Sequence, residues 1–393
     1  MDAEQCLNFF KSQHSLEINL MDLELITTNF RDLRNLCATK GFKAQSDIAS
    51  CPGLVEICLN IMRTLYFNSD VEKYQKPFNI GIQFIGNLLV GHSINKANIW
   101  IKYFNDLRNW TFNENLKTRN YCEMIIYNLM LDIEDVEEHI CKDTELLERF
   151  ILDATNELEF ACFIMEKIIA NNLQIIYENI TNDECLRLLQ IVNKCLTENH
   201  SYLSINAVSF IKETTQQYLE KVIKIDAVPF IEANIAAEFL KMTSNLSYNP
   251  QYKSLLQSDS PFITFILAKL SAVHKMGLES VNVFAPVTQL EKMESTDNHP
   301  LHLIKGLLIR IIGNLCYKSK IIQDTVREMN GIYVILDCCK YDSRSPFIMQ
   351  WSILAVANLC FNNPKNQEVI MSMPIDYSKL IRNKTIGNHL EKI

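Results

Sequence analysis

The chain has 393 residues, of which 48% are hydrophobic and 21% charged, and its formal net charge is −8. It contains only 10 glycines and 10 prolines, so its glycine content is about a third of the average for proteins. Few glycines mean few tight turns, which argues against an all-β sandwich or barrel and against loops that bring backbone close to phosphate. Long helices are therefore the expected building blocks, and the length allows two or three ordinary domains.

The charge balance indicates which partners are expected, and the cysteines indicate the cellular compartment. The 46 acidic residues exceed the 38 basic ones, so the chain as a whole repels phosphate backbones and nucleic acid is not an expected partner. The first five residues are acidic where a secretory signal is cationic, and polar residues interrupt the apolar runs 79–94 and 301–316, so no membrane insertion is expected. The 13 scattered cysteines lack a Cys-x-x-Cys pair and are interpreted as reduced core thiols of a cytoplasmic protein.

An Asn-Leu pair near the end of an apolar segment recurs along the chain and predicts a series of similar helix ends. In chain order the pairs start at Asn35, Asn87, Asn128, Asn245, Asn314 and Asn358, with a weaker case at Asn193. The last two pairs continue as Asn-Leu-Cys followed by an aromatic residue, and they lie 44 residues apart. This spacing is typical of armadillo and HEAT repeats, whose two or three helices bury their apolar faces by stacking on the next repeat.

The positions of glycines and prolines indicate where helices pack closely and where the helical pattern is interrupted. Gly81, Gly86 and Gly91 stand five residues apart within apolar sequence and are interpreted as sites of close helix packing. Residues 276–300 lose the helical period and collect polar residues with two prolines, which predicts a flexible inserted linker. We therefore expect N-terminal armadillo-like repeats over 1–275 and C-terminal ones over 301–393. The predicted fold is all-α, an armadillo/HEAT-like right-handed superhelical solenoid of two- and three-helix repeats.

The last repeat is regular enough for its helices to be predicted singly. Apolar residues from 304 to 315 recur at the spacing of one helix face, and further helices are expected over 321–329 and 332–340. Ser345-Pro346 is expected to open the third helix, with Ser345 as the N-cap, and Ser260-Pro261 to open another in the same way. A Ser-Pro pair can also be a kinase site, although capping is favoured at both places.

A family resemblance appears in these C-terminal repeats. Its residues are Arg310, Asn314-Leu315-Cys316-Tyr317, Gln323-Asp324, Gly331, Leu336-Asp337-Cys338-Cys339, Asp342, Pro346-Phe347, Trp351, Asn358-Leu359 and Asn366-Gln367. In this combination, residues 309–370 resemble the C-terminal domain of the ataxin-10 family. The resemblance implies an armadillo-like, all-helical cytoplasmic protein without catalytic activity that acts through other proteins. A perinuclear location and homo-oligomers are further expectations. The family is associated with neuron survival, neurite outgrowth, cytokinesis and ciliary complexes.

The sequence predicts no catalytic site, cofactor or metal. It has no Gly-x-Gly-x-x-Gly or phosphate-binding loop, and no Gly-x-Ser-x-Gly turn. His299 and His302 form the closest histidine pair, and a solvated loop is favoured there over a metal site. Adjacent Cys338 and Cys339 are expected in a helix with one of them facing the core, rather than as a redox pair. The acidic run 132–138 is expected to be the solvated start of a helix rather than a calcium loop or a docking site.

The repeated asparagines are the candidate partner-binding groove. In armadillo proteins the third helices line a concave face, where an Asn side chain can bond to the backbone of an extended ligand. The candidates are Asn35, Asn87, Asn128, Asn245, Asn314, Asn358 and Trp351. The equally weighted alternative is that each Asn caps its own helix end. A peptide-signal receptor of the importin type is the second functional hypothesis. It is disfavoured because no Trp stands four residues before any Asn.

Overall fold

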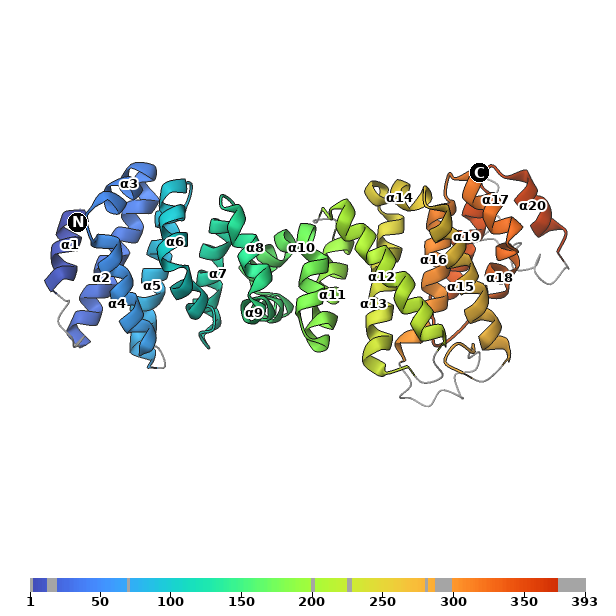
Figure 1. Cartoon of the computed structure of the whole chain (residues 1–393), viewed down its shortest axis with the longest axis horizontal. Coiled ribbons are helices and arrows are strands. Elements are labelled where there is room, and N and C mark those ends of the chain that lie inside the picture. Colours follow the sequence, from blue (N-terminus) through green and yellow to red (C-terminus); the bar gives the residue numbers. More distant parts are fainter. Residues whose placement is uncertain are drawn as a thin grey trace. The chain divides into compact units, whose positions relative to one another are not determined.

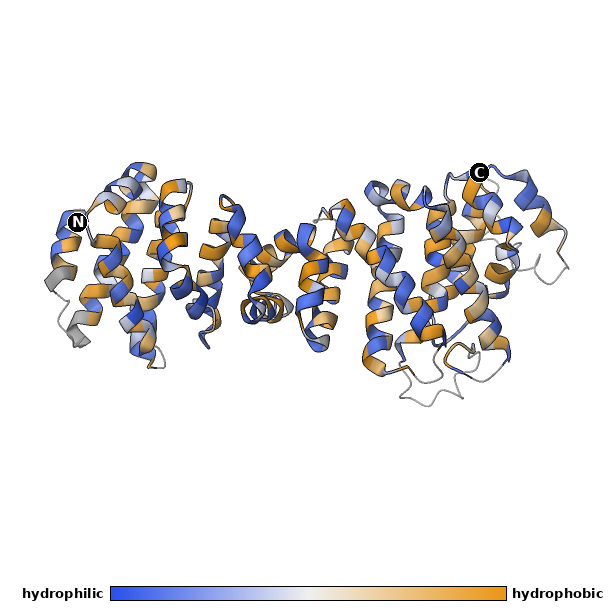
Figure 2. Ribbon diagram, in the orientation of Figure 1, coloured by the Kyte–Doolittle hydropathy of each residue, from blue (hydrophilic) through white to orange (hydrophobic). Residues whose placement is uncertain are grey.

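A computed structural model describes residues 3–12, 20–68, 71–198, 202–224, 228–279, 282–286 and 299–373. Helices and turns account for the ordered backbone of these residues, which include no β-strand (Figure 1). The predicted all-α fold of stacked helical repeats is confirmed. Figure 2 shows hydrophobic and hydrophilic residues sharing the same helices, as expected for amphipathic helices that pack on one another.

The chain divides by its internal contacts into two compact units, Met1–Ile180 and Thr181–Ile393. This division rests on spatial contacts, whereas the predicted division around 276–300 rests on composition and stays a prediction. Of the predicted linker, residues 276–279 are the last turn of a helix, and 280–281 and 287–298 lie outside the described residues.

The first unit is built from ten described helices (Figure 1). They are α1 (Ala3–Ser12), α2 (Leu20–Lys40), α3 (Phe42–Ser50), α4 (Leu54–Phe67), α5 (Glu72–Leu89), α6 (Ser93–Trp110), α7 (Leu116–Met130), α8 (Glu134–Lys142), α9 (Thr144–Thr155) and α10 (Glu159–Asn179).

Aromatic residues tie successive repeats of this unit together. The rings of Phe10 and Phe30 lie 5.2 Å apart, and those of Phe30 and Phe84 lie 6.3 Å apart, which links α1, α2 and α5. Phe78 on α5 meets Trp110 on α6 edge to face at 5.2 Å. All five side chains are fully buried, so each repeat completes the core of its neighbour, as the repeat model requires.

The second unit has the same organisation. Its described helices are α11 (Asn182–Thr197), α12 (Ile205–Lys224), α13 (Phe230–Tyr248), α14 (Pro250–Gln257), α15 (Ser260–Glu279), the 3-10 helix η2 (Pro300–Leu303), α16 (Ile304–Cys316), α17 (Lys320–Glu328), α18 (Gly331–Asp337), α19 (Ile348–Cys360) and α20 (Pro364–Met371).

Three of the Asn-Leu helix ends share the same turn. After α5, α16 and α19 the chain takes one extended residue, at Val90, Tyr317 and Phe361 respectively. The next residue is left-handed in each case, with φ between 51° and 69° at Gly91, Lys318 and Asn362. Gly91 thus serves a turn and has no atom near its Cβ position, so its predicted packing role is wrong.

The helices expected in the last repeat are present, but the Ser-Pro caps are wrong. The predicted helix 321–329 is α17, shifted by one residue, and 332–340 is the shorter α18. Residues before α19 form a turn closed by the Ile348 amide and the Ser345 carbonyl, and the Ser345 hydroxyl faces Gly306 without a described hydrogen-bond partner. Before α15 the cap is Asp259, whose carboxylate accepts from the Phe262 amide at 3.0 Å.

No single described helix is both long enough and apolar enough to cross a membrane. By length and composition alone, the pair α3 and α4 passes the test together, with a bend of 84° between them.

Candidate functional site

The candidate asparagines lie in the last turns of helices in each unit. In the first unit Asn35 lies on α2, Asn87 on α5 and Asn128 on α7. In the second unit Asn245 lies on α13, and the last two candidates lie on α16 and α19. The structure thus arranges them in rows along stacked helices.

Three of these asparagines donate a hydrogen bond to the preceding Asn-bearing helix, in one repeated register. The side-chain nitrogens of Asn87, Asn314 and Asn358 donate to the carbonyls of Arg34 (3.2 Å), Ser244 (3.4 Å) and Gly313 (2.9 Å). Each acceptor is the residue immediately before the previous helix's Asn. The interpretation that these three cap their own helix ends is therefore wrong, because their amides join neighbouring repeats.

The other three asparagines have different surroundings. Asn245 donates to the side-chain oxygen of Asn193 on α11 at 3.3 Å, so the weaker sequence match also belongs to the row. The exposed Asn35 accepts from Arg34 at 3.0 Å. Asn128 is half-buried and makes no side-chain hydrogen bond within the part of the chain that is described. Binding of a ligand by this face stays a prediction.

A second set of side-chain hydrogen bonds, which the sequence did not predict, satisfies backbone carbonyls at the ends of the Asn-bearing helices. One Gln from a short helix donates to two terminal carbonyls of the following Asn-bearing helix. The bonds run from Gln45 to Asn87 and Val90, from Gln257 to Leu315 and Tyr317, and from Gln323 to Asn358 and Phe361. These carbonyls have no partner within their own helix, so the glutamines satisfy them. Gln323 is among the family-matching residues, and its role here is structural.

Trp351 forms an aromatic and cationic platform with residues from two helices. The Arg310 guanidinium of α16 lies 5.6 Å from the centre of the Trp351 ring, and the Phe347 ring lies 5.9 Å away. Phe347 is 59% exposed and Leu354, one turn further along α19, is 48% exposed. Arg310 stands four residues before Asn314, which is the position of the Trp in the importin-type pattern. The sequence has no Trp at that position, but helix packing places the Trp351 ring beside it. We call Arg310, Phe347, Trp351 and Leu354 the α19 platform.

The structure also assembles a Cys-His-Asp arrangement that sequence spacing does not reveal. The Cys338 sulfur lies 3.4 Å from His274 Nδ1, and His274 Nε2 lies 3.1 Å from an Asp337 oxygen. Burial raises the pKa of the Cys338 thiol to about 12, so the thiolate needed for nucleophilic attack is scarce at neutral pH. Burial also lowers the pKa of His274, which disfavours an imidazolium beside the sulfur. We therefore interpret the group as part of the core.

The remaining sequence candidates have structural roles. His299 caps η2 by accepting from the Leu301 amide at 3.3 Å. Cys338 and Cys339 are both buried and follow the end of α18. The acidic run opens α8, as predicted, with Glu134 in its first turn and Asp132 paired to Lys96 at 2.7 Å. The described residues contain no group of three His, Cys, Asp or Glu side chains placed to hold a metal ion.

Two solved structures resemble the chain loosely. One is the crystal structure of an engineered protein, 12% identical, with a TM-score of 0.37, covering 98% of this chain and 85% of that one. The other comes from work on a phosphorylation switch in the interaction between cadherin and beta-catenin. It is 13% identical, has a TM-score of 0.38 and covers 95% of this chain and 67% of that one. Both scores are too low to bear on function.

Sequence relatives are more informative. Residues 304–387 match the family model described as the spinocerebellar ataxia type 10 protein domain. Human ataxin-10 is 26% identical over 414 residues, covering 97% of this chain and 85% of that protein. Bovine ataxin-10 is 26% identical over 388 residues, covering 92% and 81%. The ataxin-10 homolog of Dictyostelium discoideum is 47% identical over 68 residues, which are 17% of this chain and 11% of that protein. The predicted resemblance to the ataxin-10 family is confirmed.

Proposed function

We propose that the protein is a non-enzymatic scaffold or adaptor that binds protein partners on the faces of its Asn-bearing helices. Similarity to the ataxin-10 family and the helical repeat fold support this class of function. By the same resemblance, we propose a cytoplasmic and perinuclear location and a role in neuron survival, neurite outgrowth, cytokinesis or ciliary complexes. Self-association is one further form that such binding can take.

The α19 platform is the observation that carries this proposal. Its Phe347, the N-cap residue of α19, and its Leu354 within α19 are large exposed apolar side chains that accompany a Trp and an Arg. Trp and Arg are enriched among residues that dominate binding energy, and clustered exposed apolar groups mark interaction surfaces. A partner that covers this platform would bury apolar area without any change in the fold.

Proximity labelling in cells with two matched variants tests the proposal. Leu354→Asp places a charge on the platform, whereas Ile321→Asp makes the same kind of change at a side chain of α17 that is 80% exposed. We expect Leu354→Asp to lose defined partners that the wild type and Ile321→Asp both retain. Equal retention by both variants would remove the platform as the binding surface. The asparagines are poorer targets because Asn314 and Asn358 also hold helices together.

The alternative, a peptide-signal receptor of the importin type, needs aromatic rings free to stack on basic side chains. Arg310 already occupies the Trp351 ring, which disfavours this function. Pull-down with a basic peptide tests it directly. Strong and specific retention of that peptide would favour the receptor over the scaffold.

A further inference from the structure

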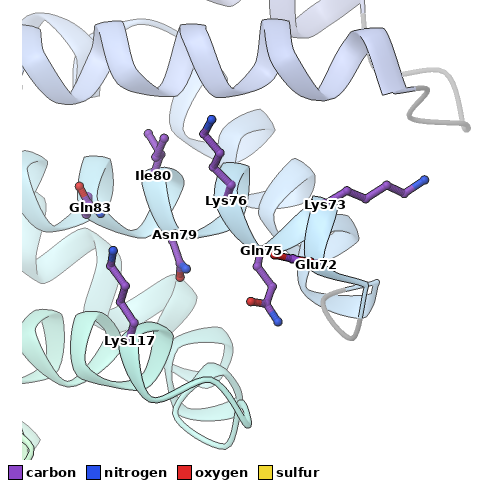
Figure 3. A pocket seen from close by; sticks show the side chains of 8 residues that line it. All are labelled: Glu72, Lys73, Gln75, Lys76, Asn79, Ile80, Gln83 and Lys117. Atoms are coloured by element: carbon purple, nitrogen blue, oxygen red, sulfur yellow. The ribbon is translucent and has the colours of Figure 1, made fainter.

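The first unit carries an open pocket of about 680 Å³ on α5, next to the start of α7 (Figure 3). It is lined by Glu72, Lys73, Gln75, Lys76, Asn79, Ile80, Gln83 and Lys117. Gln75, Asn79 and Gln83 stand at intervals of four residues, as does Asn87 one turn beyond, so these amides share one face of α5. The pocket thus extends the Asn row of the first unit.

Neighbouring helices orient two of these amides. Gln83 accepts a hydrogen bond from Arg34 of α2 at 2.8 Å, and because a guanidinium only donates, the Gln83 oxygen must face Arg34. The Asn79 oxygen accepts from the Thr118 hydroxyl of α7 at 2.7 Å. Neither amide nitrogen donates to another group within the described residues. Both nitrogens therefore remain as hydrogen-bond donors at the pocket.

The charges of the pocket are mostly positive. Lys73, Lys76 and Lys117 are exposed, and none forms an ion pair with a carboxylate among the residues that the structure describes. Figure 3 shows Lys117 rising from α7 toward Asn79 and Gln83, whereas Lys73 points outward. Glu72 is the only acidic residue among those lining the pocket. Ammonium groups and amide nitrogens together require a ligand rich in hydrogen-bond acceptors and negative charge.

We propose that this pocket binds an extended, acidic segment of a partner protein. The inference rests on the proposed scaffold function and names the chemistry of one partner. Carboxylates of the segment pair with Lys76 and Lys117, and its backbone carbonyls accept from Asn79 and Gln83. The lining residues of α5 span about 17 Å along the helix, which is the length of about five residues of extended chain. A protein segment is favoured over nucleic acid because the chain as a whole carries a charge of −8.

Fluorescence anisotropy with the full-length chain tests the proposal directly. The probe is a short labelled peptide of alternating Glu and Ser residues, compared with peptides in which Gln or Lys replaces every Glu. We expect the Glu peptide to bind, with affinity falling as salt rises, and the Gln and Lys peptides to bind at least about tenfold more weakly. Tighter binding of the Lys peptide would overturn the inference and favour the receptor alternative.

Two pocket variants and a matched control locate the binding. Gln83→Glu is nearly isosteric and keeps an acceptor for Arg34, but it replaces the pocket's donor with negative charge. Lys76→Glu with Lys117→Glu reverses two charges in the pocket. Lys43→Glu with Lys102→Glu makes the same change in net charge on exposed residues of α3 and α6. We expect both pocket variants to lose about tenfold or more in affinity for the Glu peptide and the control to lose little.

The outcomes separate this inference from the scaffold function itself. Equal losses in the pocket and control variants, or equally tight binding of a single-stranded oligonucleotide, would overturn the inference. If partner labelling still depends on Leu354 in that case, the scaffold function stands and only the acidic-segment pocket fails. If the Glu peptide binds as expected but no partner depends on Leu354, the α19 platform fails instead. Circular dichroism checks that Gln83→Glu retains the helical content of the wild type.

Discussion

At the scale of single residues, the least ordinary environment belongs to the carboxyl of Glu123 on α7. The side chain is fully buried, and neither oxygen accepts a hydrogen bond within the described residues. Asp153, also fully buried, already pairs with Arg119 at 2.9 Å and lies 3.6 Å from Arg149. Burial, together with the negative charge of Asp153, raises the pKa of Glu123 from 4.5 to about 9, so the side chain is neutral at pH 7.

This raised pKa predicts a pH-dependent stability with a definite sign. Between about pH 4.5 and 9 the unfolded chain loses the Glu123 proton while the folded chain keeps it, so stability falls as pH rises. Glu123→Gln removes that loss. We expect urea unfolding to show similar stability for both proteins near about pH 5, and a gain of about 1 to 3 kcal/mol for the variant near about pH 8.

The matched control for that measurement is Glu134→Gln, which changes an exposed carboxyl in the first turn of α8. Its effect should be a few tenths of a kcal/mol, from the lost interaction with the helix dipole. A stability difference between Glu123→Gln and wild type that stays constant across this pH range would contradict the buried, protonated carboxyl.

Residue-scale roles were only partly predictable from the sequence. The repeated asparagines stand out because their spacing is periodic, but their partners, such as Ser244 for Asn314, lie about 70 residues away in sequence. Gln45 stands 42 residues before Asn87, whereas Gln323 stands 35 residues before Asn358, so the two glutamines match only if an insertion is allowed. Sequence spacing alone does not reveal such an insertion.

At the scale of helices, close contact between α16 and α19 depends on glycine. A Cβ atom at Gly313 would lie 2.9 Å from the Ala355 Cβ and 3.0 Å from its Cα, which belongs to the backbone. A Cβ at Gly86 on α5 would lie 2.5 Å from the terminal methyl of Met124 on α7. The first neighbour cannot move without shifting a helix, whereas the second is the end of a flexible side chain.

Substitution by Ala should therefore affect the free energy of unfolding differently at these two glycines. Gly313→Ala forces α16 and α19 apart, and we expect a loss of about 1 to 3 kcal/mol in the free energy of unfolding. Gly86→Ala displaces only the Met124 methyl and gains up to about 1 kcal/mol of helix propensity, so it should be neutral or slightly stabilising. Thermal unfolding of the two variants provides the comparison. Equal destabilisation would show that Met124 is as rigid as the α19 backbone.

Helix identity was more predictable than helix starts. The period of apolar residues determines which segments become helices, and α17 lies within one residue of its expected range. The start of α19 differs because the Ser345 hydroxyl packs toward Gly306 on α16 instead of capping its own helix. A capping motif is a local preference, and packing against another helix can override it.

At the scale of the whole molecule, the two compact units predict local effects of substitution. In repeat proteins each element contacts its neighbours, so stability is close to a sum of local terms. We expect Glu123→Gln to change amide hydrogen exchange in Met1–Ile180 and Gly313→Ala to change it in Thr181–Ile393, each leaving the other unit as in the wild type. A uniform change across both units from either variant would indicate that the chain opens as one cooperative block.

The sequence by itself determined the helical class, the repeated helix ends and the resemblance to the ataxin-10 family, and it excluded glycine-rich phosphate loops. These properties depend on composition and on periodic spacing, which are local along the chain. Only the tertiary structure decided what the polar side chains do: Asn358 joins two repeats, Arg310 covers Trp351, and Gln83 presents a donor beside Lys117. The physical reason is that a side chain's partner comes from whichever helix packs beside it, and packing joins residues that are far apart in sequence.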